Sequence, residues 1–153
     1  MSVVELSDEE TVAILAETFT ERLSDIGDKT RQVAVLKRLH TLLDSTSPQH
    51  YIYETVEGCD ELQVIRVGSD QRIFCRLVMG IPHGNEHYNV LFVFYVDPHQ
   101  YRPQQLSRFD AAAEQRLDEI TSFDAVDAVD DYLDEKDAFT AEEIKERIDH
   151  LDG

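Results

Sequence analysis

The chain lacks tryptophan and has few cysteines, prolines and basic side chains: two Cys, four Pro and 14 Lys plus Arg in 153 residues. Cys59 and Cys75 have no metal or redox spacing, so we expect two reduced core thiols of a cytoplasmic protein. No basic region followed by a long apolar stretch opens the chain, so no signal peptide is predicted. The longest apolar run, 90–96, is too short to cross a bilayer, so no membrane partner is expected.

Several catalytic and ligand-binding motifs are also missing. The chain has no Gly-rich phosphate loop, no Gly-x-Ser-x-Gly elbow and no Cys–His nucleophile pattern. It has no internal repeat and no linker rich in Pro, Gly and Ser. A hydrophobic content of 42% over 153 residues predicts one domain with a real core.

What the chain does have is acid: 32 Asp and Glu give a formal net charge of -18. The excess is uneven. Residues 48–116 carry nine acids and six bases, all arginine, whereas residues 117–153 carry fourteen acids and three bases. Many carboxylates with few lysines predict a halophilic protein, since salt at 1 M screens repulsion beyond about 3 Å.

Apolar spacing predicts the elements. A strand is expected at 2–6, then a helix capped by Ser7 and carrying Val12, Leu15 and Leu23 on one face. Gly27 ends this helix and Asp28 caps a second one. Strands are expected at 51–56, 62–67, 71–79 and 89–96, with an irregular loop at 80–87.

Three helices are expected after the strands, at 104–121, 124–135 and 140–151, the last with a Thr140–Glu143 capping box. The predicted fold class is α+β: an N-terminal strand and helical hairpin on a small antiparallel sheet, followed by C-terminal helices. We divide the chain into an α+β domain, 1–121, and an acidic helical extension, 122–153.

Several local patterns resemble the RelE/ParE toxin superfamily over residues 2–120. The segment 61–76 is similar to its core hairpin, in which a strand ends in Arg-x-Gly and the next begins with an arginine. The run 90–96, followed by a polar turn, Pro103 and Arg116, resembles the HigB-like branch.

The resemblance implies a metal-independent, ribosome-associated mRNA endoribonuclease that works by 2′-hydroxyl attack on the phosphodiester. It implies RNA or the ribosome and an antitoxin protein as partners, and neither DNA nor a cofactor. Fixed cations and acid–base groups suit this chemistry. The implied catalytic residues are Arg72, Arg76, His99 and Tyr101. The implied RNA-binding residues are Arg66, Tyr95 and Arg102.

Other interpretations stay open. The hairpin arginines could instead pair with Glu54, Glu61 or Asp70, and Tyr95 could belong to the core. His83, Glu86 and His87, with Asp97 and His99, could bind a metal, although Pro82 and Gly84 disfavour a helical His-x-x-x-His site.

The acidic tail could be a solvated cap, a partner- or oligomer-binding element, or an inhibitor lying over the arginines. The alternative function is a non-catalytic protein-binding module of the same fold, in a halophilic archaeon or its virus. It is favoured by the acidic composition and by Asp97, which stands where the family has lysines.

Overall fold

A computed structural model describes residues 10–52, 54–55, 59–68, 71–83, 86–97, 103–122 and 126–152. The order of strands and helices along the chain is the predicted one, with two helices after the first strand and three after the last strand. The strands are β1 (Thr11–Leu15), β2 (Glu54–Thr55), β3 (Gln63–Val67), β4 (Gln71–His83) and β5 (Glu86–Asp97). The helices are α1 (Glu17–Asp25), α2 (Lys29–Asp44), the 3-10 helix η1 (Pro48–Tyr51), α3 (Pro103–Thr121), α4 (Val126–Glu135) and α5 (Ala141–Asp152).

The five strands form one mixed sheet in the order β1-β5-β4-β3-β2. Strands β2 to β5 are antiparallel neighbours, whereas β1 pairs with β5 in parallel. The α+β class is therefore confirmed. The most apolar strand, β5, is expected at the centre of the sheet, but the central strand is β4 and β5 lies next to it.

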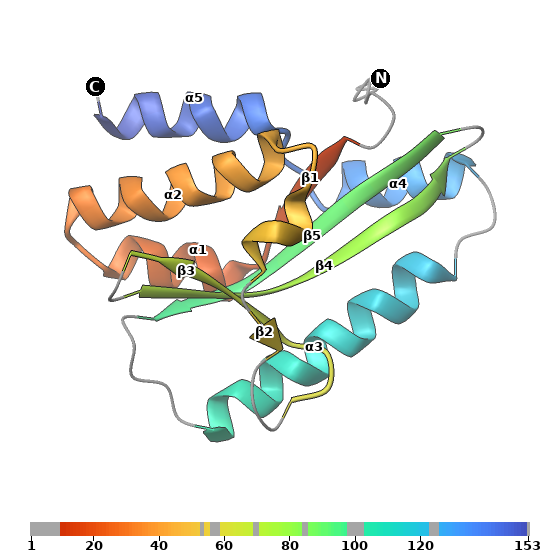
Figure 1. Cartoon of the computed structure of the whole chain (residues 1–153), viewed down its shortest axis with the longest axis horizontal. Helices are drawn as coiled ribbons and strands as arrows, with labels where there is room; N and C mark the ends of the chain where they lie inside the picture. The colour runs from red at the N-terminus through yellow and green to blue at the C-terminus, as the bar shows by residue number, and fades with distance from the viewer. Residues whose placement is uncertain are drawn as a thin grey trace.

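Helices cover both faces of the sheet (Figure 1). On one side α1, α2 and α5 bury an apolar cluster with the inward residues of β4 and β5, such as Ile73, Cys75 and Val93. On the other side α3 and α4 pack on Phe74, Val90 and Phe92. The strands alternate between these two clusters, which is why the interior strands are apolar on both faces.

The first helix starts later than predicted. Thr11–Leu15 is strand β1, so the prediction of a helix over Val12 and Leu15 is wrong, and α1 begins at Glu17. The spacing suits a helix, but Val12, Ala13 and Ile14 also form a short apolar run that pairs with β5 and is buried on both faces, with Val12 and Ile14 in one apolar cluster and Ala13 in the other. Periodicity alone does not separate these cases. The strand expected at 2–6 lies outside the described residues.

The prediction of an irregular loop at 80–87 is wrong as well. Strand β4 continues to His83 and β5 begins at Glu86, so the two form one long hairpin. A register shift between Val78 and Ile81 accommodates Gly80, whose φ is +70°. Such a bulge needs the conformational freedom of glycine, whereas in the sequence alone Gly80 indicates the start of a loop. The strand expected at 51–56 is also shorter: Tyr51 belongs to η1, and β2 has two residues.

Three predicted helix signals are confirmed. Asp28 accepts hydrogen bonds from the N–H groups of Thr30 and Arg31, at 2.9 and 3.4 Å. Gly27 adopts a φ of +71° between α1 and α2. The capping box of α5 is closed in both directions, because Glu143 N–H donates to Thr140 Oγ1 at 3.2 Å and Thr140 N–H donates to Glu143 Oε1 at 3.1 Å.

The acidic C-terminal helices contribute to both apolar clusters. Val129 and Leu133 of α4 are buried on the α3 side, and Ile144 and Ile148 of α5 are buried against α2. These four side chains are therefore covered by the chain itself. The domain boundary at 121/122 stays a prediction. Within the described residues, no helix combines the length and apolar composition needed to cross a bilayer.

Candidate functional site

The ends of β3, β4 and β5 bring two of the predicted arginines together. The β3–β4 register places Arg66 directly opposite Arg72, and the β4–β5 register places Asp97 on the other side of Arg72. Residues two apart on a strand share a face, so Arg72 lies on the face of Phe74, which packs toward α3. Arg66 is exposed and Arg72 is half-buried.

Tyr95 lies on this same face, because it pairs with Phe74 across the β4–β5 ladder. Its ring stacks on Phe109 of α3 with centroids 5.0 Å apart and an interplanar angle of 24°. Tyr95 is thus half-buried in a ring pair. It is placed to support neighbouring groups more than to offer an open platform for a base.

Two further arginines extend the ring pair. The Cζ atom of Arg22 in α1 lies 5.9 Å from the Tyr95 ring centroid, and that of Arg108 in α3 lies 4.9 Å from the Phe109 ring centroid. Such contacts attract guanidinium groups to aromatic rings. We call the set Arg22, Arg66, Arg72, Tyr95, Arg108 and Phe109 the arginine–aromatic corner.

Arg22 is positioned because β1 is shorter than its neighbour. Strand β1 stops opposite Val93, which leaves the last residues of β5 at the sheet edge. Helix α1 fills the gap: Thr18 Oγ1 donates to the Phe94 carbonyl at 2.6 Å and Arg22 Nε donates to the Val96 carbonyl at 3.3 Å. The edge is thereby capped, and one guanidinium group is fixed beside Tyr95.

A side chain from a helix also caps the edge of the sheet at β3. Among the described residues, β2 pairs only with Gln63 and Val64, so the rest of β3 has no strand on the side away from β4. Arg38 Nε of α2 donates to the Arg66 carbonyl at 3.0 Å. Its Cζ lies 5.1 Å from the Tyr51 ring centroid. A cation therefore stands beside the backbone of Arg66 as well.

Arg76 has a different environment from the other two hairpin arginines. It shares their face of the sheet, but its Nη1 lies 3.0 Å from Glu61 Oε2 in a largely buried ion pair. Its Nε is buried and has no hydrogen-bond partner among the residues that the structure describes. Arg76 therefore matches the alternative interpretation, in which a hairpin arginine pairs with Glu61.

The helix that carries Arg108 and Phe109 is anchored by the next residue, Asp110. Its carboxylate accepts backbone N–H bonds from Glu61 at 2.7 Å, Leu62 at 3.0 Å and Asp60 at 3.2 Å. Burial alone would raise the pKa of Asp110, but these three donors together lower it below its usual value. Asp110 thus ties α3 to the segment before β3.

The remaining predicted site residues, His99, Tyr101 and Arg102, lie outside the described residues, so their roles stay predictions. Asp97, which precedes them, is only 6% exposed. Its carboxylate is therefore hardly presented at the surface, where it would repel an anion.

The proposed metal ligands do not all meet. Asp97 and His87 lie near opposite ends of β5, about 33 Å apart for ten residues of strand, so a site that combines them is excluded. The side chains of His83, Glu86 and His99 lie outside the described set. Among the side chains that are described, no three His, Cys, Asp or Glu could hold one ion.

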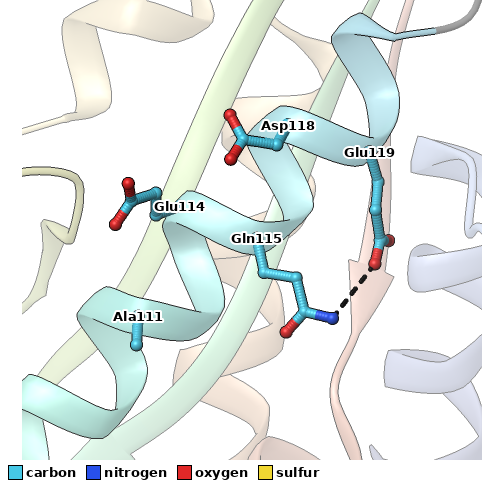
Figure 2. Close-up of a pocket in the computed structure, with 5 residues that line it drawn as sticks. All are labelled: Ala111, Glu114, Gln115, Asp118 and Glu119. Atoms are coloured by element: carbon cyan, nitrogen blue, oxygen red, sulfur yellow. Dashed lines mark hydrogen bonds between the residues drawn. The ribbon is translucent and has the colours of Figure 1, made fainter.

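The outer surface of α3 is acidic, in contrast to the corner. A shallow depression there is lined by Ala111, Glu114, Gln115, Asp118 and Glu119 (Figure 2). Glu119 accepts hydrogen bonds from Gln115 at 3.3 Å, Arg116 at 2.9 Å and the Tyr132 hydroxyl at 2.9 Å. Burial and this bond to Glu119 raise the pKa of Tyr132 to about 12. This surface would repel a polyanion.

Sequence reasoning missed Arg22, Arg108, Phe109 and Asp110. Their contacts join residues far apart in the chain, so no local spacing marks them. The run Arg108-Phe109-Asp110 on a predicted helix was the one signal available.

Comparison with known proteins gives no match to this chain among family models, curated proteins or solved structures. The RelE/ParE resemblance therefore rests on the residues quoted above.

Proposed function

We propose that the arginine–aromatic corner binds the phosphate backbone of single-stranded RNA, as a RelE/ParE-like protein would. The observation that carries this proposal is the direct cross-strand pairing of Arg66 with Arg72. Like charges directly opposite each other on a sheet are unfavourable. Asp97 faces Arg72 from the β5 side and offsets part of that repulsion; an anion bound at the two arginines would offset more of it, which supports a phosphate ligand.

The chemistry of the groups supports phosphate over other ligands. Guanidinium groups match phosphate oxygens in a bidentate geometry and stay charged at any physiological pH. In a high-salt cytoplasm long-range attraction is screened, so only direct contacts of this kind contribute. The acidic outer surface of α3 would disfavour any other path for the RNA backbone.

The finer proposal is metal-independent cleavage of mRNA at the ribosome. In this scheme the 2′-oxygen bonds to the scissile phosphorus as the P–O5′ bond breaks, which leaves a 2′,3′-cyclic phosphate and a 5′-hydroxyl. Arg72 stabilises the charge that develops on the phosphate, and His99 or Tyr101 removes the 2′ proton and supplies a proton to the leaving 5′-oxygen. Arg102 would hold the neighbouring phosphate. Arg76 would contribute indirectly, since its guanidinium group is engaged by Glu61.

Binding is tested with a short labelled single-stranded RNA and fluorescence anisotropy over a series of KCl concentrations. Each phosphate contact on a single strand contributes about 0.7 to the salt slope. Arg72→Ala should weaken binding and flatten the slope by about that amount. Arg31→Ala is the matched control, because Arg31 is an exposed arginine of α2, whose buried face packs on the opposite side of the sheet. Equal affinities for all three proteins would refute the site.

Cleavage is tested separately with ribosome-bound mRNA in EDTA. Wild type should cut, Arg72→Ala should be slowed, and a message with 2′-O-methyl groups should resist. Induced expression should arrest growth, and Arg72→Ala should relieve the arrest. RNA binding without cleavage would leave the corner in place and remove the nuclease.

The second candidate is a non-catalytic protein-binding module. It is favoured by Tyr95, whose ring is already stacked on Phe109, and by Arg76, which is already paired. Under this alternative the wild type neither binds RNA in a salt-dependent manner nor arrests growth.

A further inference from the structure

A pocket of about 310 Å³ opens between α1, α2 and α5, on the side of the sheet opposite α3. In Figure 1 these three helices lie together on that side. Leucines from β1 and all three helices form its apolar lining, and polar groups complete it. The lining residues are Leu15, Thr20, Leu23, Ser24, Gln32, Leu36, Arg147, His150 and Leu151.

The lining is unusual for this chain because it contains no carboxylate. Thirty-two residues of the protein are acidic, yet the two titratable groups at the pocket are Arg147 and His150, one turn apart on α5. None of the ion pairs of the described residues involves Arg147. Its Cζ lies 5.3 Å from the Phe139 ring centroid, which holds the guanidinium group beside the pocket.

Of the other three polar side chains of the lining, Thr20 and Gln32 have their donors in use, and Ser24 offers one more O–H donor to a ligand. The Thr20 hydroxyl donates to the Glu17 carbonyl at 3.0 Å, and the Gln32 amide donates to the Leu23 carbonyl at 2.9 Å. Arg147 and His150 are therefore the side chains that can offer N–H groups to a ligand. A ligand that satisfies them accepts hydrogen bonds and carries negative charge.

We propose that this pocket binds a small monocarboxylate with an aliphatic body. The body would fill the leucine-lined interior, and the carboxylate would pair with Arg147, with His150 as a second donor. The volume lies at the lower end of the range for small-molecule sites, which favours a short chain over a long lipid. The lining shares no residue with the arginine–aromatic corner, whose two rings lie on the other side of the sheet, although Arg22 of the corner precedes the lining residue Leu23 on α1.

The probe is octanoate, used below its micelle-forming concentration at fixed salt, with isothermal calorimetry and leucine-methyl NMR of the whole chain. Octanoate should bind saturably and shift the methyl signals of Leu15, Leu23 and Leu151. The neutral analogue 1-octanol should bind more weakly. Arg147→Gln should weaken octanoate up to about fivefold, the upper end of what one exposed ion pair contributes, and should leave 1-octanol unchanged.

Lys145→Gln is the control, because it removes the same charge from an exposed position of the same helix outside the lining. It should change octanoate affinity less than twofold. Absence of saturable binding to the wild type, or methyl shifts elsewhere in the chain, would overturn the site. An equal loss in both variants would show attraction by net charge alone and would also overturn it. Circular dichroism checks that each variant is folded.

Discussion

Asp110 is a carboxylate that stabilises this acidic chain through defined contacts. It accepts three consecutive backbone N–H bonds and so joins α3 to the chain before β3. Its neighbours Arg108 and Phe109 belong to the corner, so the same contact positions a structural helix and a candidate site.

Asp110→Asn should destabilise the fold by about 2 kcal/mol, because an amide can present only one acceptor oxygen and turns its NH₂ toward another donor. Urea unfolding at neutral pH measures the loss. Asp118→Asn is the matched control on the same helix: this exposed carboxylate has only solvent and like charges to lose, so its removal should be neutral or slightly stabilising.

The difference between wild type and Asp110→Asn should also depend on pH. The pKa of Asp110 is lower in the folded chain than its usual value of 3.8, so folding favours the charged form. The contribution of Asp110 to stability is complete above pH 3.8 and is lost as the pH falls through the lower pKa of the folded chain. A difference that stays constant down to acid-induced unfolding would contradict this assignment.

At the scale of elements, the stability of helix α5 depends on the cap of its first turn and on its buried apolar face. The Thr140–Glu143 capping box satisfies orphan N–H groups, and Ile144 and Ile148 follow it into the core beside α2. Its partner α4 is linked to α3 through Tyr132 and Glu119. The acidic helices are therefore joined to the rest of the fold by specific contacts.

Thr140→Ala should cost about 1 kcal/mol of unfolding free energy, because the N-cap hydroxyl is lost at a helix that contributes to the core. Thermal unfolding followed at 222 nm measures it. Thr41→Ala is the control. Thr41 lies on the exposed surface of α2, and alanine is a better helix former than this β-branched residue, so the substitution should be neutral or stabilising. Equal costs for both variants would show that the cap has no special role.

At the scale of the whole molecule, the net charge of -18 opposes the compact state. Fewer than half of the 32 carboxylates can each have a cationic partner, since the chain has 14 Lys and Arg side chains. We therefore expect the compact state to depend on screening by salt.

The melting temperature should rise as KCl is increased from ~0.1 M to ~1 M, because the Debye length falls from about 10 to about 3 Å. Neutralising the exposed pair Glu114 and Asp118 with Gln and Asn should raise stability at low salt by about 1 kcal/mol, or about 2–4 °C, and should have little effect at high salt. A melting temperature insensitive to salt would remove the high-salt interpretation.

The sequence by itself determined the α+β class, the element order and the helix caps, because these depend on neighbours a few residues apart. Asp28, Gly27 and Thr140 were recognised from local chemistry alone. The boundaries of β1 and the β4–β5 hairpin were missed, since a short buried run and a glycine bulge need their partner strand to be identified.

Only the tertiary structure decided which charged groups meet. Strand alternation already placed Arg72 and Arg76 on one face, but the register put Arg66 opposite Arg72 and left Arg76 to Glu61. Arg22 and Arg108 joined the corner through contacts with rings on other elements. The pocket between α1, α2 and α5 likewise forms only when these three helices and β1 pack together. Side-chain neighbours across the fold depend on distances that linear spacing does not contain.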